Sequence, residues 1–391
     1  MAEFLSYGRQ TIEDDDVAAV AEALRADYLT TGPRVEAFEA AFAGAVQAGH
    51  AVACSSGTAG LHLAMLALDL QAGEVVIAPA ITFAATANCA RYQGAEVIFA
   101  DVDPDTGLMT PETLQAALGR LDGRKLAAVL PVHLAGNAVD LPALKGLAAP
   151  APLVEDACHA LGTTMAFDNV RERVGDGRHA AMACFSFHPV KTITTAEGGM
   201  VTTNDARLAE RLRLFRSHGI VRDPAAFETP SPGPWAYEMQ ALGFNYRLPD
   251  VLCALGASQL AKLDRFAARR RALALRYWTL LARLAPAVRP IAPPPICDPA
   301  LHLFIVLIDF AGLGVGRAEV MAGLRARGVG SQVHYIPVHR QPYYRGRYGE
   351  IALPGADAYY ARALSLPLYP GMSDADPDRV VEALAEVLRL A

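Results

Sequence analysis

Between about residue 50 and residue 205, short apolar runs alternate with amphipathic stretches along the chain. The amphipathic stretches, such as 57–70 and 82–93, have the spacing of helices. Near-continuous apolar strands separated by helices indicate an α/β fold with a mostly parallel sheet covered by helices on both faces. The sheet is expected to have seven strands, at 51–54, 74–78, 95–100, 126–131, 152–155, 183–187 and 199–203.

Helices are also predicted on both sides of this core, at 11–27 and 33–47 before it and at 250–284 after it. A proline-rich stretch at 223–236 is predicted to be an exposed loop. Six prolines in 286–299 mark the expected domain boundary. We therefore expect a large domain at 1–285 and a smaller α+β domain at 286–391. The elements predicted in the smaller domain are strands at 302–308 and 330–334 and helices at 317–327, 356–363 and 375–390.

The composition narrows the class of protein. With 52% hydrophobic and 19% charged residues among 391, the chain is expected to be globular. The net charge of −6 and the scattered basic residues give no electrostatic footprint for nucleic acid. The amino terminus has no basic region followed by a hydrophobic segment, and no uncharged apolar run reaches about 18 residues. Neither a secretory signal nor a membrane-spanning helix is therefore expected.

The six cysteines form no C-x-x-C pair and show no metal-type spacing. Most lie in apolar surroundings, which favours reduced core residues in a cytoplasmic protein. His133 and His179 have no partner at ligand spacing, so no metal site is predicted.

Lysine is rare in this chain, because only four of its 35 basic residues are lysines. Lys191 differs from the other three in following an apolar, strand-like run at 183–188. An arginine at this position could not become a neutral amine, whereas a lysine can, and a neutral amine forms a Schiff base with an aldehyde. The alternative is a lysine that simply ends a strand.

A second group of residues suits a phosphate-bearing, ring-shaped cofactor. Gly57, Thr58 and Ala59 follow a strand and open a helix, where backbone N–H groups can hold a phosphate; an ordinary helix cap is the alternative. Asp156 ends a strand, where ligands bind in a parallel sheet. Its carboxylate can keep a heterocyclic nitrogen protonated, or it can cap the following turn.

Two further residues complete the set. Ser186 lies five residues before Lys191 and can direct its hydroxyl to a phosphate. Phe83 follows another strand and can stack on a flat ring, although it can equally be a core residue. Together the phosphate cradle, carboxylate, aromatic ring and lysine match the requirements of pyridoxal 5′-phosphate.

Five motifs resemble the DegT/DnrJ/EryC1/StrS family of fold-type-I, pyridoxal-phosphate-dependent aminotransferases, which act on nucleotide-linked keto sugars. They are Tyr-Leu-Thr-Thr-Gly-Pro at 28–33, Ser-Ser-Gly-Thr-Ala at 55–59, Glu-Asp-Ala-Cys-His-Ala-Leu-Gly at 155–162, Ser-Phe-His-Pro-Val-Lys at 186–191 and Gly-Phe-Asn-Tyr-Arg at 243–247.

The resemblance implies a role for each matching residue. Lys191 carries the cofactor and moves protons, and Asp156 pairs with the ring nitrogen. The phosphate is held by Gly57, Thr58 and Ser186, and Phe83 stacks on the ring. His159 takes the place of a glutamine, common in the family, near the phenolic oxygen. Asn245 reaches the neighbouring subunit's cofactor, so a homodimer with shared active sites is implied.

Narrower matches at 6–10, 188–192 and 333–339 resemble the family branch of the pseudaminic acid pathway. That branch aminates the 4-keto carbon of a UDP-linked 4-keto-6-deoxy-N-acetyl-L-altrosamine, with L-glutamate as donor. Tyr7, Thr30, His188 and Arg247 then become candidate substrate contacts. Aminotransferases for GDP-perosamine or dTDP-amino sugars remain alternatives.

Three other classes fit the sequence less well. A sugar 3-dehydratase of the same fold carries histidine in place of Lys191. The stretch 312–317 superficially suggests a dinucleotide-binding loop, but Arg317 stands where the third glycine of the motif belongs. A non-catalytic regulator would not need the lysine, carboxylate and phosphate set.

Overall fold

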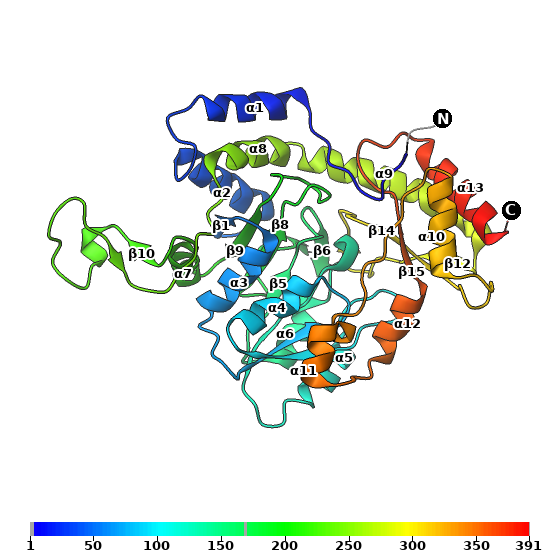
Figure 1. Cartoon of the computed structure of the whole chain (residues 1–391), viewed down its shortest axis with the longest axis horizontal. Helices are drawn as coiled ribbons and strands as arrows, with labels where there is room; N and C mark the ends of the chain where they lie inside the picture. The colour runs from blue at the N-terminus through cyan, green and yellow to red at the C-terminus, as the bar shows by residue number, and fades with distance from the viewer. Residues whose placement is uncertain (1–3, 168–169, 391) are drawn as a thin grey trace.

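The computed structural model describes residues 4–167 and 170–390 (Figure 1). Its main sheet combines two hydrogen-bonded groups of strands, β1-β9-β8-β5 and β3-β2-β4. Parallel bridges from Val129 to Leu153 and from Val132 to Asp156 join the two groups. All pairs are parallel except those that β9 makes with β1 and β8. The strands are β1 His50–Cys54, β2 Val75–Pro79, β3 Glu96–Ala100, β4 Leu126–Val129, β5 Val154–Asp156, β8 Met182–Ser186 and β9 Gly199–Thr203.

The predicted α/β fold with a mostly parallel sheet is therefore confirmed. Every residue of β2 and β9 is buried, as is typical of strands covered on both faces. The helices of this part of the chain are α1 Asp14–Leu24, α2 Pro33–Val46, α3 Gly57–Ala67, α4 Ala84–Tyr92, α5 Pro111–Leu118, α6 Leu141–Ala148, α7 Ala206–Arg216 and α8 Asp250–Leu260.

A second, antiparallel sheet of order β12-β14-β15 lies in the carboxyl-terminal part. Its core includes the rings of Tyr277 and Phe304, which stack with centroids 4.6 Å apart. The predicted strand at 330–334 is wrong, because only Gln332 forms a bridge, to Ser365 of β15. Residue 330 instead pairs with Leu5 of the amino-terminal segment. The elements are β12 Val288–Pro290, β14 Phe304–Ile308, β15 Ala363–Leu366, α10 Arg317–Ala326, α11 Pro342–Tyr348, α12 Pro354–Arg362 and α13 Asp376–Leu388.

The single helix predicted at 250–284 is two helices in the structure. The first, α8, ends at Leu260, and the second is α9 Leu263–Leu281. The first turns of α9 join the core of the large sheet, whereas its later residues join the core of the small sheet. The helix thus contributes to both cores, and the division of the chain at 285/286 stays a prediction.

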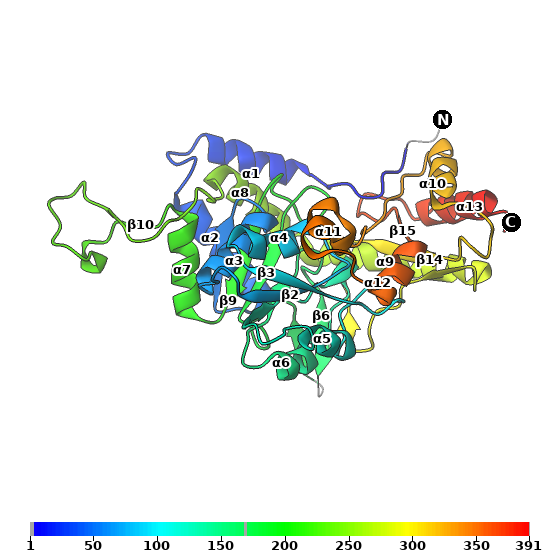
Figure 2. The same cartoon turned by 60° about the horizontal axis from the view of Figure 1, so that its bottom comes forward.

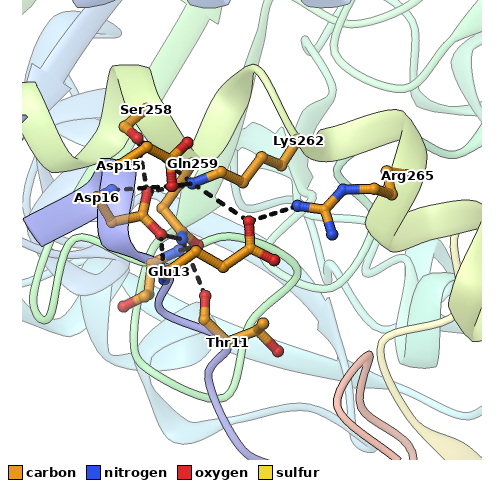
Figure 3. A network of polar contacts seen from close by, with 9 residues as sticks. Thr11, Glu13, Asp15, Asp16, Ser258, Gln259, Lys262 and Arg265 are labelled. Carbon is orange, nitrogen blue, oxygen red and sulfur yellow. Dashed lines mark hydrogen bonds and ion pairs between the residues drawn. The ribbon is translucent and has the colours of Figure 1, made fainter.

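Lys262 lies at this break and binds the start of α1 (Figure 3). Its Nζ is 2.7 Å from Asp16 Oδ1 and 2.6 Å from Asp15 Oδ1. Gln259 donates to Asp16 Oδ2 at 2.7 Å and to the Thr11 carbonyl at 3.0 Å. These contacts hold α1 against α8 and α9. The group that makes them consists of Glu13, Asp15, Asp16, Ser258, Gln259 and Lys262.

Two features lie outside the main layers. The strands β6 Thr164–Phe167 and β7 Val170–Arg173 form an antiparallel sheet with β13 Cys297–Asp298. An arm at 217–243 projects from the body of the molecule beside α7 (Figures 1 and 2). The arm contains the pair β10 Ile220–Val221 and β11 Glu238–Met239, and Trp235 and Leu242 within it are 73% and 78% exposed.

Within the described ranges, no helix is both long and apolar enough to cross a bilayer. No group of three or more His, Cys, Asp or Glu side chains is arranged to hold a metal ion in that same part of the chain.

Candidate active site

A cavity of about 660 Å³ opens where β5 and β8 end. Its walls come from the start of α3, the turn after β8, the amino-terminal segment and residues 332–341. Nine predicted site residues line it: Tyr7, Gly57, Thr58, Phe83, Asp156, His159, Ser186, His188 and Lys191. The other four, Thr30, Ala59, Asn245 and Arg247, are not among its lining residues.

Lys191 is presented by a tight turn directly after β8. Its backbone N–H donates to the His188 carbonyl at 2.9 Å, and the following residues return to Phe187 through the Thr195 N–H at 3.0 Å. Burial lowers the pKa of Lys191, and the nearby Asp156 and Cys158 only partly oppose this effect. The amine is therefore neutral at a lower pH than an exposed lysine would be.

Asp156 ends β5 and is buried. Its Oδ1 accepts the Cys158 N–H at 3.2 Å, and its Oδ2 accepts the Thr86 hydroxyl at 2.6 Å. Thr82 Oγ1 is in turn 2.6 Å from Thr86 Oγ1. Neither threonine was predicted to have a role in the site, because Thr82 lies before α4 and Thr86 in its first turn, where no helical spacing pairs them.

The start of α3 forms a cradle beside these groups. Ser56 caps the helix by accepting the Ala59 N–H at 3.1 Å. The amide of Ala59 is therefore engaged, whereas the first N–H groups of a helix, here those of Gly57 and Thr58, have no intrahelical partner. A Cβ on Gly57 would lie 2.9 Å from Ser186 Cβ. A glycine is thus needed for this close approach.

A wall of uncharged rings faces the lysine. Burial lowers the pKa of His159 and His302 well below their usual range, and that of His334 to about 3. The Ala135 N–H donates to His159 Nδ1 at 3.3 Å, which assigns the ring proton to Nε2. That Nε2 lies 3.1 Å from the Tyr335 hydroxyl, so Tyr335 keeps its own proton available to donate.

Three of these wall residues were missed by the sequence reading. Tyr335 and His334 lie in the motif at 333–339, which pointed to the pseudaminic branch but gave them no role. His302 follows no motif, and only the fold brings it to His159, with ring centroids 4.6 Å apart.

The predicted residues differ in how they meet the cavity. Tyr7 packs on His334 with centroids 5.5 Å apart, and its carbonyl accepts the Leu368 N–H at 3.1 Å. Phe83 precedes α4, is 59% exposed and lies 6.1 Å from the Tyr335 ring. His188 is exposed at the rim.

Asn245 is exposed and sits in a segment tied to the cradle strand. The carbonyl of its neighbour Tyr246 accepts the Ser55 N–H at 2.8 Å, and the Tyr246 hydroxyl lies 3.2 Å from His62 Nδ1 on α3. Thr30 is exposed in the loop before α2, and Arg247 is half-buried. None of these three predicted residues, Asn245, Thr30 and Arg247, belongs to the described lining of the chain's own cavity.

The model of the DegT/DnrJ/EryC1/StrS aminotransferase family matches residues 10–385. The chain belongs to this family. The family predicted from the motifs is thus confirmed, and the chain is a pyridoxal-phosphate-dependent sugar aminotransferase.

Several solved structures superpose along nearly the whole chain. Helicobacter pylori PseC, an aminotransferase involved in the biosynthesis of pseudoaminic acid, is 28% identical with a TM-score of 0.88 and 100% coverage of both chains. The PLP-form of the sugar aminotransferase Spr1654 from Streptococcus pneumoniae is 25% identical, with a TM-score of 0.87 and 99% coverage of both. DesI, solved in the presence of its TDP-sugar product, is 31% identical with a TM-score of 0.86, covering 99% of this chain and 94% of its own.

The residues present fit pyridoxal phosphate. A largely buried amine of lowered pKa, a buried carboxylate and a helix start too tight for any side chain at residue 57 line one cavity. These are the groups that an aldehyde, a ring nitrogen and a phosphate require.

Proposed function

We propose that this enzyme transfers an amino group from L-glutamate to the 4-keto carbon of UDP-4-keto-6-deoxy-N-acetyl-L-altrosamine, in pseudaminic acid biosynthesis. The observation that carries the proposal is the Lys191 amine of lowered pKa in one cavity with the Asp156 carboxylate. The likeness to PseC over the full length of both chains supports the choice of sugar.

Lys191 transfers protons in the proposed reaction, and Asp156 holds one in place. When bound, pyridoxal phosphate supplies an aldehyde that takes up the amino group and a ring that receives the electrons of the broken C–H bond. The neutral Nζ of Lys191 removes a proton from one carbon and returns it to another. Because Lys191 lies on one side of the cavity, it returns that proton to one face of the sugar carbon. Asp156 holds a proton on the ring nitrogen.

The cradle and the ring wall fix the position of the reacting groups. The N–H groups of Gly57 and Thr58 and the Ser186 hydroxyl bind phosphate, and Ala59 contributes only its small size, because Ser56 engages its amide. Phe83 covers one face of the ring. The 3.1 Å contact with His159 fixes the Tyr335 hydroxyl, which would donate to the phenolic oxygen of the bound cofactor, and both rings stay uncharged near neutral pH.

The substrate sites extend beyond one chain. Tyr7 and His188 line the cavity and contact the sugar nucleotide. We propose a homodimer in which Asn245 reaches the phosphate of the partner subunit's cofactor, since it is exposed and does not line its own cavity. Thr30 and Arg247 meet the substrate at the same interface.

A second substrate class has its own support. DesI, solved with its TDP-sugar product, has the same fold at 31% identity, slightly above the value for PseC. A dTDP-linked 4-keto sugar is therefore the alternative acceptor.

An absorption spectrum of the purified protein, taken before and after L-glutamate is added, tests the first half of this proposal. We expect a visible band that L-glutamate replaces with an ultraviolet band. UDP- and dTDP-linked 4-keto sugars, added next, should restore the visible band only when the sugar is accepted. A visible band that ignores L-glutamate would contradict the donor, and restoration by the dTDP sugar alone would contradict the proposed acceptor.

A further inference from the structure

Two threonines are linked to Asp156 by hydrogen bonds, and one of them, Thr82, lines the cavity together with Lys191. Thr86 belongs to α4 and Thr82 precedes it, and the two side chains are 0% and 1% exposed. Apolar neighbours in this segment, Ile81, Ala87 and Cys89, are fully buried as well. A hydroxyl in such a place is costly unless it is hydrogen-bonded, and both hydroxyls here are.

The hydrogen bonds run in one direction. An ionised carboxylate only accepts, so the Thr86 hydroxyl must donate its single proton to Asp156 Oδ2, at 2.6 Å. Thr86 Oγ1 is then left as an acceptor, and the proton in its 2.6 Å contact with Thr82 comes from Thr82. The relay therefore runs from Thr82 through Thr86 to Asp156.

This geometry differs from that of an ordinary helical threonine. Threonine hydroxyls inside helices commonly bond the carbonyl three or four residues earlier. Thr86 instead directs its hydroxyl across the sheet edge to a residue 70 positions later in the chain. Hydrogen bonds to an ionised group in a low-dielectric site are stronger than those between neutral groups.

We propose that Thr86, oriented by Thr82, is a positioning residue for the ring-nitrogen carboxylate. The Thr86 hydroxyl fixes the rotation of the Asp156 carboxylate and stabilises its negative charge. As a result, the proton between Asp156 and the ring nitrogen stays on the nitrogen, where it strengthens electron withdrawal. The inference rests on the role of Asp156 in the proposed function.

The test compares Thr86→Val, which keeps the shape and removes the hydroxyl, with Thr86→Ser, which keeps the hydroxyl. We expect Thr86→Val to lower kcat by about ten- to a hundredfold with KM nearly unchanged, as for a lost hydrogen bond to a charged group. Thr86→Ser should stay within about threefold of the wild type, and Thr82→Val should lose roughly fivefold, since it acts one bond further away.

Two readouts do not depend on turnover. The dissociation constant of pyridoxal phosphate for the apoprotein should rise in Thr86→Val by about tenfold. The ¹⁵N chemical shift of ring-labelled pyridoxal phosphate bound to the protein should move toward the unprotonated value in Thr86→Val and not in Thr86→Ser.

Asp156→Asn separates failure of this inference from failure of the proposed function. If Asp156→Asn loses activity and shifts the ¹⁵N signal while Thr86→Val does neither, the relay is overturned and the proposed function stands. If Asp156→Asn also behaves as wild type, the role of Asp156 itself is wrong. An equal loss in Thr86→Val and Thr86→Ser would assign the effect to packing and overturn the relay. If Thr86→Val does not fold, the relay would be overturned by wild-type ¹⁵N signals in Thr82→Val together with a loss of activity in Thr86→Ser.

Discussion

Lys191 and Lys262 both lie away from bulk solvent, and burial alone would lower the pKa of each amine. The pKa values of the two amines nevertheless shift in opposite directions. The pKa of Lys191 is lowered, because only the Coulomb attraction of Asp156 and Cys158 opposes the loss of hydration. The pKa of Lys262 is raised, because hydrogen bonds to Asp15 and Asp16 outweigh that loss.

The difference lies in hydrogen-bonded partners. Lys262 Nζ is within 3.8 Å of three carboxylates, of which Asp16 is completely buried. Around Lys191, the cavity wall combines the uncharged rings of His159 and His334 with Asp156, which acts on the amine through space. Lysine thus has a structural role at residue 262, where carboxylate partners keep it charged. At residue 191 it has a chemical role, because burial makes the neutral amine accessible.

The largest effect is expected when Lys191 is removed. Lys191→Ala should lower turnover by at least about a thousandfold, because no other lysine is found among the described residues that line the cavity, and an amine is needed to carry the proton. Thermal unfolding of the apoprotein should show a midpoint at or above that of the wild type, since a desolvated amine is lost. A Lys191→Ala enzyme with normal steady-state turnover would end the proposed mechanism.

Lys262→Met should give the opposite result. Turnover per folded molecule stays within about threefold of the wild type, whereas the free energy of unfolding falls by roughly 3 kcal/mol, because Asp16 is left as a buried charge without its cation. Urea unfolding followed by circular dichroism measures the change.

The matched control is the double variant Lys262→Met/Asp16→Asn. With the buried charge also removed, part of the lost stability should return, so that the two single effects are not additive. Additive losses would mean that Lys262 and Asp16 are not coupled, contrary to their 2.7 Å contact.

The strands could be predicted from the sequence because parallel strands that are buried on both faces consist of nearly continuous apolar residues. The runs at 74–78 and 95–100, for example, correspond to β2 and β3 within one residue at each end. The prediction failed at 330–334, where the sequence Gly-Ser-Gln-Val-His contains one large apolar side chain, Val333, and no continuous apolar run. There the Gly330 N–H donates to the Leu5 carbonyl, and Gln332 forms a bridge with Ser365 of β15. That pairing is decided by residues far away in the chain, which local pattern cannot report.

The candidate site shows the same limit. Lys191, Asp156 and Gly57 stand at strand ends or helix starts, where local sequence carries meaning, and they line the cavity. Thr86 and His302 carry no motif, because their relevance comes only from contact with Asp156 and His159. The break in the helix at Lys262 was also missed, since residues 250–284 lack proline and the break serves a contact with α1.

The two lysines should also give stability profiles of opposite slope against pH. The raised pKa of Lys262 means that its contribution is present below the unfolded value of about 10.4 and is lost as pH rises through the folded pKa. For Lys191, the unfolded chain binds more protons between the lowered folded pKa and about 10.4, so stability rises with pH in that window.

Urea unfolding of the apoproteins at several pH values measures these slopes. The stability difference between wild type and Lys262→Met should be constant near neutrality and shrink above about pH 10.4. Lys191→Met should be more stable than wild type near pH 7, with an advantage that fades as pH approaches about 10.4. Slopes of the same sign for both variants would contradict the comparison.

The smallest effect belongs to a third lysine, which is paired but exposed. Lys125 Nζ lies 2.6 Å from Glu74 Oε1, as close as Lys262 is to Asp15, yet 77% of the Lys125 side chain is exposed. Water and salt screen such a pair, so Lys125→Met should change the free energy of unfolding by less than about 1 kcal/mol. The effect should disappear in about 1 M salt, whereas that of Lys262→Met should largely persist, because buried charges are screened less. If Lys125→Met cost as much as Lys262→Met, contact distance rather than burial of the lysine would set the energy.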